Sequence, residues 1–346
     1  MFEKGVNVVM TASVAIYLVT YRRPEMLKRA VKSVLSQTHQ NWMLRIVNDD
    51  PTDRSVEHLI EEVHDPRVRL FQPELKRGAT INFNLICSET EADYVSLLED
   101  DNWWEAEFLT EMIATMERNP WTNIAVGNER LWQELPLGEW QNTGRTIWNF
   151  SEEKVHEYDV LDLCGDAKLC NSSMLIRTSA VGNFKTPDTI PVDVTEHFRE
   201  RLFPKRIVLN GKPLVNYAIT LETARGKGDR WGLYQVMLIS SVFEALATEE
   251  QRSELAVMLW KACDSPSSPR ASILIEAGVA SHAARMLYKL APIPTHLKRH
   301  LRNFKRLLQG RTKLEKVANF DAEMHFLRAA PLVRELALEM QATDLT

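Results

Sequence analysis

The sequence has few cysteines: only Cys87, Cys164, Cys170 and Cys263 occur in 346 residues, and they lie far apart. They form neither a C-x-x-C pair nor an evenly spaced framework, which argues against a disulfide-stapled domain and against a cysteine metal site. Disulfides belong to oxidising compartments, so this usage is typical of a reduced, cytosolic environment.

Long apolar runs are also missing. No stretch reaches the roughly 18 apolar residues that a membrane-spanning helix needs, and the N-terminus lacks the charged and apolar regions of a secretory signal. We therefore expect a cytoplasmic protein. Peripheral contact with the inner face of a membrane stays open.

Glycine and proline are not enriched: the chain has 13 Gly and 15 Pro. Hydrophobic residues make up 45% and charged residues 26%, which excludes fibrous and disordered classes and is typical of a globular protein. The net charge of -5 gives no reason to expect nucleic acid as a partner. Nothing in the composition indicates an oligomeric state.

Apolar runs alternate with amphipathic segments in the first hundred residues. The run S-V-A-I-Y-L-V-T from Ser13 is typical of a strand buried on both faces, and Pro24 opens a segment with helical apolar spacing. The same reasoning predicts strands at 43–47, 68–71 and 94–98 and helices at 56–63 and 80–89. Such alternation predicts an α/β fold with a mostly parallel central sheet flanked by helices.

The character of the chain changes near residue 230, after which helical patterns dominate. We predict an N-terminal lead at 1–12, an α/β domain at 13–229 and a helical C-terminal subdomain at 230–346.

Three predicted strands end in polar or acidic groups: T-Y-R-R-P from Thr20, N-D-D-P-T-D after Val47, and E-D-D-N after Leu98. Carboxyl ends of parallel strands meet at one edge of a sheet, where ligands bind. Clustered carboxylates suit a hard divalent cation such as Mg²⁺ or Mn²⁺, although the cluster taken alone is more simply explained as a solvated acidic turn.

The order of these motifs resembles the family 2 glycosyltransferases of the GT-A fold, over about residues 13 to 220. The resemblance rests on four motifs: V-T-Y-R-R-P at 19–24, V-N-D-D-P-T-D at 47–53, Gly78 followed six residues later by Asn84, and the acidic motif Glu99-Asp100-Asp101.

The resemblance implies the GT-A fold and a nucleoside-diphosphate sugar donor, expected to be a UDP-sugar. Thr20 and Tyr21 would line the nucleotide pocket, Asp49 would accept a hydrogen bond from the base, and Asp101 would bind Mn²⁺ or Mg²⁺. Glu99 would face the ribose or sugar. The other residues implied in donor binding are Arg23, Arg77, Asn84 and Asp100. Two positions depart from the family pattern, since Asn48 and Glu99 each replace an aspartate.

A catalytic base is implied nine residues after Phe184, at Asp193. It would take the proton from an acceptor hydroxyl, giving inversion at the sugar. Glu196, three residues on, is the alternative base. Asp193 is also explained without catalysis, as an acid stabilised at the start of a helix.

Two further features carry weaker hypotheses. Six tryptophans fall in residues 103–148, and Trp103 or Trp104 is expected to approach a sugar, whereas most of the six are expected to pack in the core or at its rim. Residues 289–316 contain nine Lys or Arg and one acid. This segment predicts contact with an anionic membrane or a phosphorylated acceptor, or else a solvated helix face.

The leading hypothesis is a metal-dependent inverting glycosyltransferase acting on a carbohydrate or other hydroxyl acceptor. The alternative is a catalytically inactive GT-A-like binding or scaffold protein that recruits a partner through its helical tail. A nucleotidyltransferase or dinucleotide-dependent oxidoreductase is disfavoured because no glycine-rich phosphate loop follows the first strand.

Overall fold

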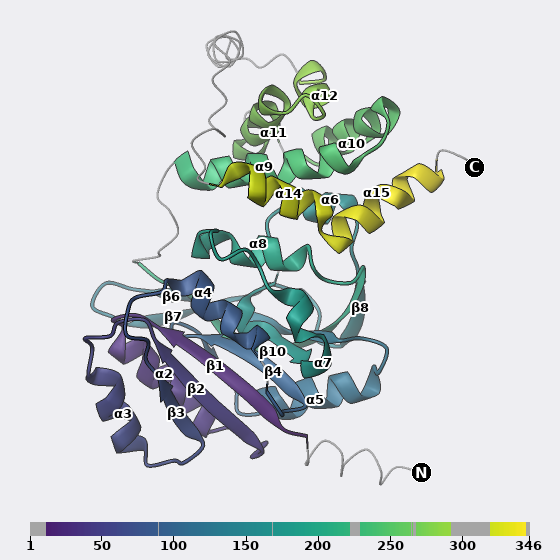
Figure 1. Ribbon diagram of the computed structural model, residues 1–346. Coiled ribbons are helices and arrows are strands. Elements are labelled where there is room, and N and C mark those ends of the chain that lie inside the picture. The colour runs from purple at the N-terminus through teal and green to yellow at the C-terminus, as the bar shows by residue number, and fades with distance from the viewer. Residues whose placement is uncertain are drawn as a thin grey trace, which may run out of the picture. The chain divides into compact units, whose positions relative to one another are not determined.

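The computed structural model describes residues 12–88, 90–167, 169–221, 229–263, 265, 268–291 and 319–343 (Figure 1). The chain forms two compact units that are interleaved in sequence. The first takes its residues from 1–157, 168–188 and 206–223, and the second from 158–167, 189–205 and 224–346. The predicted single boundary near residue 230 thus differs from the observed division, because two inserts within the α/β region pack with the C-terminal helices.

A ten-stranded sheet forms the centre of the first unit. The strands are β1 (Val14–Thr20), β2 (Trp42–Asn48), β3 (Val68–Phe71), β4 (Tyr94–Glu99), β5 (Trp103–Trp104), β6 (Ile124–Glu134), β7 (Trp140–Thr146), β8 (Glu153–Glu157), β9 (Met174–Arg177) and β10 (Arg206–Ile219). Their order is β3-β2-β1-β4-β9-β6-β10-β5, with β7 on β6 and β8 on β10. The first four are parallel, as predicted, whereas β9 is antiparallel to both of its neighbours, so the second half of the sheet is mixed.

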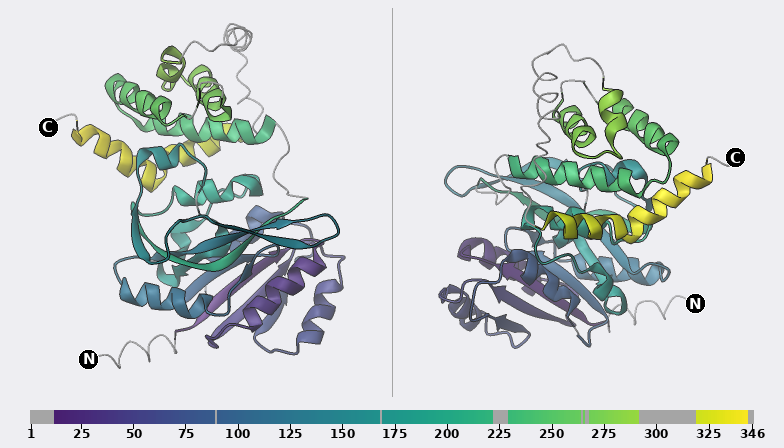
Figure 2. Two further views of the ribbon diagram at one scale, coloured as in Figure 1. Left: turned by 180° about the vertical axis from the view of Figure 1, so that it is seen from behind. Right: turned by 45° about the horizontal axis from the view of Figure 1, so that its top comes forward.

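Helices cover both faces of this sheet. The helices α2 (Pro24–Leu35), α3 (Ser55–Val63) and α5 (Phe108–Arg118) lie on the face turned toward the viewer in the left panel of Figure 2. The short helices α4 (Ala79–Phe83) and α7 (Thr178–Val181) lie on the other face. The helix predicted at 80–89 is shorter than expected, because α4 gives way to a 3₁₀ turn at Asn84–Cys87.

The apolar periodicity of α2 explains how the first unit is held together. Leu27, Val31 and Val34 are buried on one face of the helix and join a core with Ile16 of β1 and Leu44 of β2. Proline at the first helical position costs no hydrogen bond, so Pro24 starts the helix directly after the loop that follows β1.

The carboxyl ends of β1, β2 and β4, which the sequence predicted to meet, are in register. Thr20 pairs with Asn48 across β1 and β2, and Val19 pairs with Glu99 across β1 and β4. The chain passes from β1 to β2 on one side and later returns to β4 on the other side of β1. The strand order therefore reverses at β1, and ligands of α/β sheets bind at such a switch point.

The second unit is helical. It contains α6 (Val160–Leu163), α8 (Thr195–Glu200), α9 (Asp229–Ala245), α10 (Glu249–Lys261), α11 (Pro269–Ala280), α12 (Arg285–Lys289), α14 (Phe320–Ala329) and α15 (Pro331–Thr343). Within the described residues, no helix has both the length and the apolarity to cross a bilayer. The basic segment 289–316 lies outside the described residues apart from 289–291.

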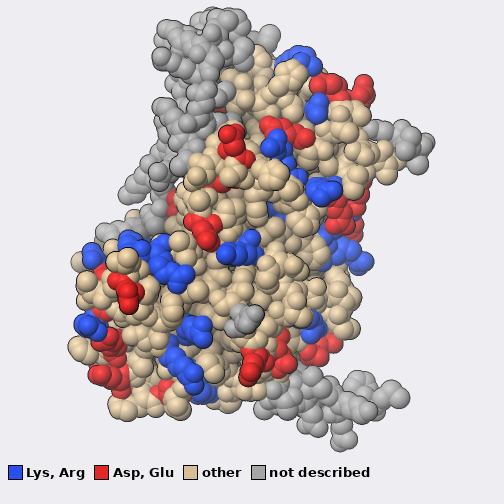
Figure 3. All heavy atoms as spheres, in the orientation of Figure 1, with Lys and Arg blue, Asp and Glu red and all other residues tan. Residues whose placement is uncertain are grey.

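Charges of both signs are interspersed on the described surface seen in Figure 3, rather than gathered into one large patch. This distribution agrees with the mild net charge of the chain.

Candidate functional site

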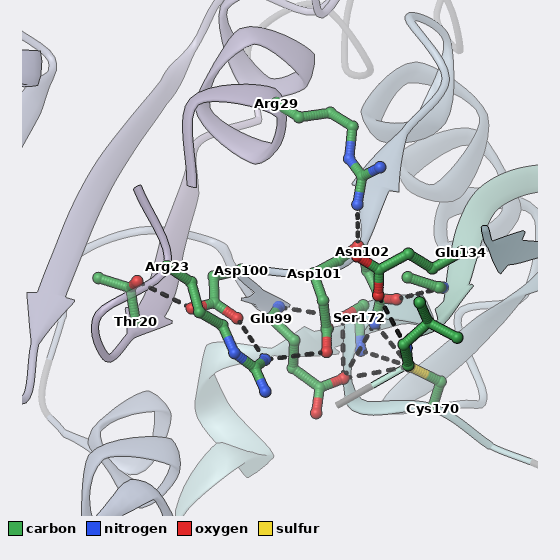
Figure 4. A network of polar contacts seen from close by, with 12 residues as sticks. Thr20, Arg23, Arg29, Glu99, Asp100, Asp101, Asn102, Glu134, Cys170 and Ser172 are labelled. Atoms are coloured by element: carbon green, nitrogen blue, oxygen red, sulfur yellow. Dashed lines mark hydrogen bonds and ion pairs between the residues drawn. The ribbon is translucent and has the colours of Figure 1, made fainter. Parts of the chain in front are cut away.

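The acidic turn after β4 is the centre of the candidate site (Figure 4). The Thr20 hydroxyl donates to Asp100 Oδ2 at 2.8 Å. Arg23 Nη1 lies 3.2 Å from Asp100 Oδ1 and 3.2 Å from Asp101 Oδ2, so one guanidinium bridges both carboxylates. Residues from the end of β1 and the end of β4 thus meet, as the strand ends predicted.

The two carboxylates are electrostatically strained. Burial, followed by repulsion from Asp101, raises the pKa of Asp100 to about 6, against the opposing effects of Arg23 and Thr20. Burial also raises the pKa of Asp101, although Arg23 and Arg29 act in the other direction. Both carboxyls are therefore harder to ionise than exposed aspartates, and a cation bound beside them would favour their charged forms.

Glu99 is held toward the segment before β9. Its Oε2 accepts hydrogen bonds from Ser172 Oγ at 3.0 Å, Asn102 Nδ2 at 3.2 Å and Cys170 Sγ at 3.3 Å. The glutamate side chain is one methylene longer than the aspartate of the family pattern, and this added length serves the contact with residues 170–172. A role facing the ribose or sugar stays a prediction.

Asp49 organises the loop before α4. Its carboxylate accepts from the backbone N–H groups of Arg77 at 2.8 Å and of Gly78 at 3.0 Å. Gly78 has φ +90°, a conformation that glycine adopts without strain. The bonds bring Asp49 and Arg77 together at the end of β2, and contact between Asp49 and a base remains a prediction.

Asn48, the first departure from the family pattern, shapes the turn after β2. Its amide donates to the Asp53 carbonyl at 3.1 Å while its oxygen accepts from the Asp50 N–H at 3.2 Å. An ionised aspartate accepts only, so the donated bond explains why asparagine suits this position.

Tyr21 lies at the rim of this region and is 37% exposed. Lys76 Nζ is 3.6 Å from the centroid of its ring, and the guanidinium carbon of Arg22 is 5.2 Å away. Arg22 also donates to Asp50 and holds the pKa of that carboxyl at about 2. Basic side chains therefore surround the aromatic ring predicted to line the nucleotide pocket.

Asn84 uses its full hydrogen-bonding capacity within the first unit. Its nitrogen donates to the Thr186 carbonyl at 2.8 Å and to Asp188 Oδ1 at 2.7 Å, and its oxygen accepts from the Thr186 N–H and hydroxyl. It links the turn after α4 to residues 186–188. A direct hydrogen bond from Asn84 to a nucleotide-sugar substrate would have to replace one of these contacts.

Comparison with known proteins identifies the family. Residues 15–178 match the model of glycosyl transferase family 2. The chain carries a family 2 glycosyltransferase domain. It is 28% identical over 102 residues to a putative colanic acid biosynthesis glycosyl transferase, WcaA, of Escherichia coli K12, covering 29% of this chain and 37% of that relative.

Two further likenesses agree. Over 106 residues the domain is 28% identical to the UDP-Glc:alpha-D-GlcNAc-diphosphoundecaprenol beta-1,3-glucosyltransferase WfgD of Escherichia coli, covering 31% of this chain and 42% of WfgD. The chain thus spans less than half the length of these curated relatives. Its fold resembles that of S. aureus TarS 1-349 in complex with UDP-GlcNAc, with a TM-score of 0.53, 11% identity and coverage of 96% and 92%. The mixed sheet with flanking helices is the GT-A fold.

The expectation that Trp103 or Trp104 approaches a sugar is wrong for Trp104, and for Trp103 it stays a prediction. Trp104 is buried, stacks on Phe108 with centroids 4.2 Å apart, and donates its indole N–H to the Ser172 carbonyl. The ring of Trp103 is covered by the guanidinium of Arg29, whose central carbon is 3.8 Å from the ring centroid.

Several residues around the acidic turn escaped the sequence analysis. Arg29 donates to the Asp101 carbonyl at 2.6 Å, and Glu129 on β6 accepts from the Cys170 N–H at 3.3 Å. Burial raises the pKa of Glu129 to about 8. The signal that the sequence offered for Glu129 was the polar group Asn128-Glu129-Arg130, which interrupts the otherwise apolar segment 124–131.

The candidate bases belong to the second unit. Asp193 lies in a 3₁₀ turn at Val192–Val194, and Glu196 lies in the first turn of α8. This helix is anchored by Phe198, whose ring stacks on Phe326 of α14 with centroids 5.9 Å apart. The structure thus confirms the local start of a helix at Asp193, and catalysis by either residue stays a prediction.

The residues of the acidic turn fit a divalent cation. Asp100 and Asp101 carry carboxylate oxygens, the ligand type that Mg²⁺ and Mn²⁺ prefer, and both carboxylates contact the same Arg23 nitrogen. Asp101 is the more accessible ligand, with 23% of its side chain exposed against 8% for Asp100.

Proposed function

We propose that the protein is a metal-dependent inverting glycosyltransferase that transfers a sugar from a UDP-sugar to a hydroxyl acceptor. The observation that carries the proposal is the Asp100–Asp101 turn, held by Thr20 and Arg23 at the carboxyl edge of a family 2 domain. Support for the donor comes from the UDP-Glc in the name of WfgD and the UDP-GlcNAc bound to TarS.

The donor would bind along the ends of β1, β2 and β4. Thr20, Tyr21 and Asp49 would face the nucleoside, and Arg77, in the loop bound to Asp49, would lie beside it. The remaining donor-site residues are Arg23, Asn84, Glu99 and Asp100.

Asp101 would be the direct ligand of Mn²⁺ or Mg²⁺, with Asp100 beside it. When bound there, the cation supplies Lewis-acid stabilisation of the charge on the departing diphosphate. The guanidinium of Arg23, already next to both carboxylates, adds positive charge at the same place. Thr20 holds Asp100 so that its carboxylate keeps its orientation.

Asp193 would act as general base. It takes the proton from the acceptor hydroxyl while that oxygen attacks the anomeric carbon from the side opposite the diphosphate, which inverts the configuration. Glu196 is the alternative base.

The acceptor would be a carbohydrate or another hydroxyl compound. Since WfgD is named for an acceptor linked to diphosphoundecaprenol, a lipid-linked acceptor at the cytoplasmic face of a membrane is a reasonable choice. The basic segment 289–316 would then contact anionic lipid there.

Hydrolysis of UDP-sugars tests the proposal. Purified protein is incubated with UDP-glucose or UDP-GlcNAc, with and without Mn²⁺, and release of UDP is measured. We expect Mn²⁺-dependent release by the wild type, none by Asp101→Asn, and unchanged release by Asp65→Asn, a carboxylate paired with Arg67 outside the candidate site. Binding of UDP without release of UDP from any donor would favour the inactive scaffold.

A further inference from the structure

Arg29 of α2 is enclosed by two tryptophans. Its guanidinium carbon lies 3.8 Å from the ring centroid of Trp103 and 4.1 Å from that of Trp140. A guanidinium is planar and weakly hydrated, so it stacks on indole faces more readily than an ammonium does. The three side chains form what we call the Arg29 clamp.

The clamp holds the acidic turn at two points. Arg29 Nη2 donates to the carbonyl oxygen of Asp101 at 2.6 Å (Figure 4), and Trp103, two residues further, supplies one of the stacking rings. Arg29 of α2 therefore holds the backbone carbonyl of Asp101, whereas Arg23 contacts its carboxylate.

The second ring of the clamp comes from another part of the sheet. Trp140 begins β7 and pairs with Glu134 of β6. Trp103 also packs on Trp132 of β6, with centroids 5.4 Å apart. The β6–β7 hairpin thus contacts the side chains of Trp103 and Arg29, which adjoin the acidic turn.

Burying the charged side chain of Arg29 at this position costs folding free energy. Its Nε is buried without a hydrogen-bond partner among the described residues, and burial lowers its pKa to about 10. A leucine or methionine would fill the slot between two rings without that cost. A carbonyl oxygen, however, needs a donor, and among these side chains Arg29 supplies it.

We propose that Arg29 is a positioning residue that sets the orientation of the Asp101 turn for cation binding. The inference rests on the proposed metal site at Asp101. It assigns to the Arg29 clamp no contact with donor or acceptor. Groups that hold metal ligands in place typically contribute about 10- to 100-fold to metal affinity.

The test compares Arg29→Gln with Arg67→Gln in the full-length protein. Arg67 provides a matched control because its guanidinium carbon lies 3.7 Å from the ring centroid of Trp42, another arginine–tryptophan stack, at the start of β2 and β3 rather than at their carboxyl ends. Mn²⁺ binding is measured by electron paramagnetic resonance, and amide hydrogen exchange of residues 98–104 is measured without metal.

We expect Arg29→Gln to weaken Mn²⁺ binding on the order of tenfold and to speed exchange in 98–104, whereas Arg67→Gln changes neither. Trp140→Leu, which removes one ring and leaves the hydrogen bond, should give a smaller loss and serves if Arg29→Gln fails to fold. The inference would be overturned if Arg29→Gln and Trp140→Leu both bound Mn²⁺ with an affinity within twofold of the wild type. Equal losses of Mn²⁺ affinity in Arg29→Gln and Arg67→Gln would also overturn it.

The metal site itself is tested separately. If the wild type does not bind Mn²⁺, or Asp101→Asn binds it equally well, the proposed metal site is wrong. The exchange measurement then still decides whether Arg29 orders the turn, because it is made in the absence of metal.

Discussion

Arg23 reaches Asp101 at 3.2 Å from the loop that joins β1 to α2, and the same Nη1 reaches Asp100. A positive group already lies where an incoming cation would interact with both carboxylates. The internal ion pair and an external cation must therefore compete for Asp101.

Replacing Arg23 tests this competition. We expect Arg23→Gln to bind free Mn²⁺ roughly two- to fivefold more tightly, a change that corresponds to the interaction free energy of a partly exposed ion pair. The same variant should bind UDP more weakly because a positive charge near the diphosphate is lost. Mn²⁺ titration and UDP calorimetry measure the two effects. Arg22→Gln, whose side chain pairs with Asp50 instead, is the control and should leave Mn²⁺ affinity unchanged. Equal or weaker Mn²⁺ binding by Arg23→Gln contradicts the competition.

Glu129 should make stability depend on pH. Burial raises the pKa of its carboxyl in the folded protein to about 8, compared with 4.5 in the unfolded chain. Between these values the folded state binds more protons than the unfolded state, so the free energy of unfolding decreases as pH rises from about 4.5 to about 8. This sign is opposite to that of a salt-bridged carboxylate.

Glu129→Gln copies the protonated side chain and removes the titration. At pH 5 the variant and the wild type should unfold with similar free energies, and at pH 8 the variant should be more stable by roughly 3 to 5 kcal/mol, since each pKa unit corresponds to about 1.4 kcal/mol. Urea unfolding at both pH values gives the comparison. A difference that does not change with pH would show that Glu129 does not titrate in this range.

We expect glycine to be required at position 78 because of its backbone conformation, and not because a side chain would clash with its neighbours. It has φ +90°, and a Cβ added there would meet no atom within 4 Å. Gly78→Ala is therefore expected to cost about 1–3 kcal/mol of folding free energy from backbone strain and to weaken UDP binding, because the Gly78 N–H is bonded to Asp49. Urea unfolding and calorimetry measure both.

Gly182 is the matched control for Gly78. It also has open space around it, but its φ is −58°. Gly182→Ala should be neutral or stabilise by about 0.4–1 kcal/mol. Similar destabilisation of both variants would mean that strain at Gly78 is not the cause.

The sequence predicted those parts of the site that depend on local pattern. The strands β1, β2 and β4 are mostly apolar, and polar residues follow where each strand ends. Thr20, Asp49 and Asp100 could therefore be expected at one sheet edge. The register between Thr20 and Asn48 confirms that expectation.

The parts that escaped prediction depend on contacts between distant segments. Nothing near Arg29 in sequence indicates that Trp140 will stack on it, and the partners of Glu99 come from residues 170 and 172. Local apolarity also cannot separate a tryptophan that stacks in the core from one that faces a ligand, which is why the expectation for Trp104 was wrong. The interleaved units have the same origin, since residues 189–205 join the C-terminal helices through tertiary packing.

The last prediction concerns the catalytic base. Asp193→Asn keeps the size of the side chain but cannot accept the acceptor proton, so turnover should fall by roughly 10²- to 10⁴-fold while affinity for UDP stays the same.

Glu196→Gln should be much milder, because three residues along a helix displace a side chain by about 4.5 Å, too far to serve the same hydroxyl. Both residues lie at the start of α8, so a shared loss of stability is checked by thermal unfolding of each variant. Steady-state transfer to an acceptor separates the outcomes. If Asp193→Asn keeps its turnover and Glu196→Gln loses it, the base is Glu196 and inversion stands; if both variants remain active, neither carboxylate takes the proton and the proposed mechanism fails.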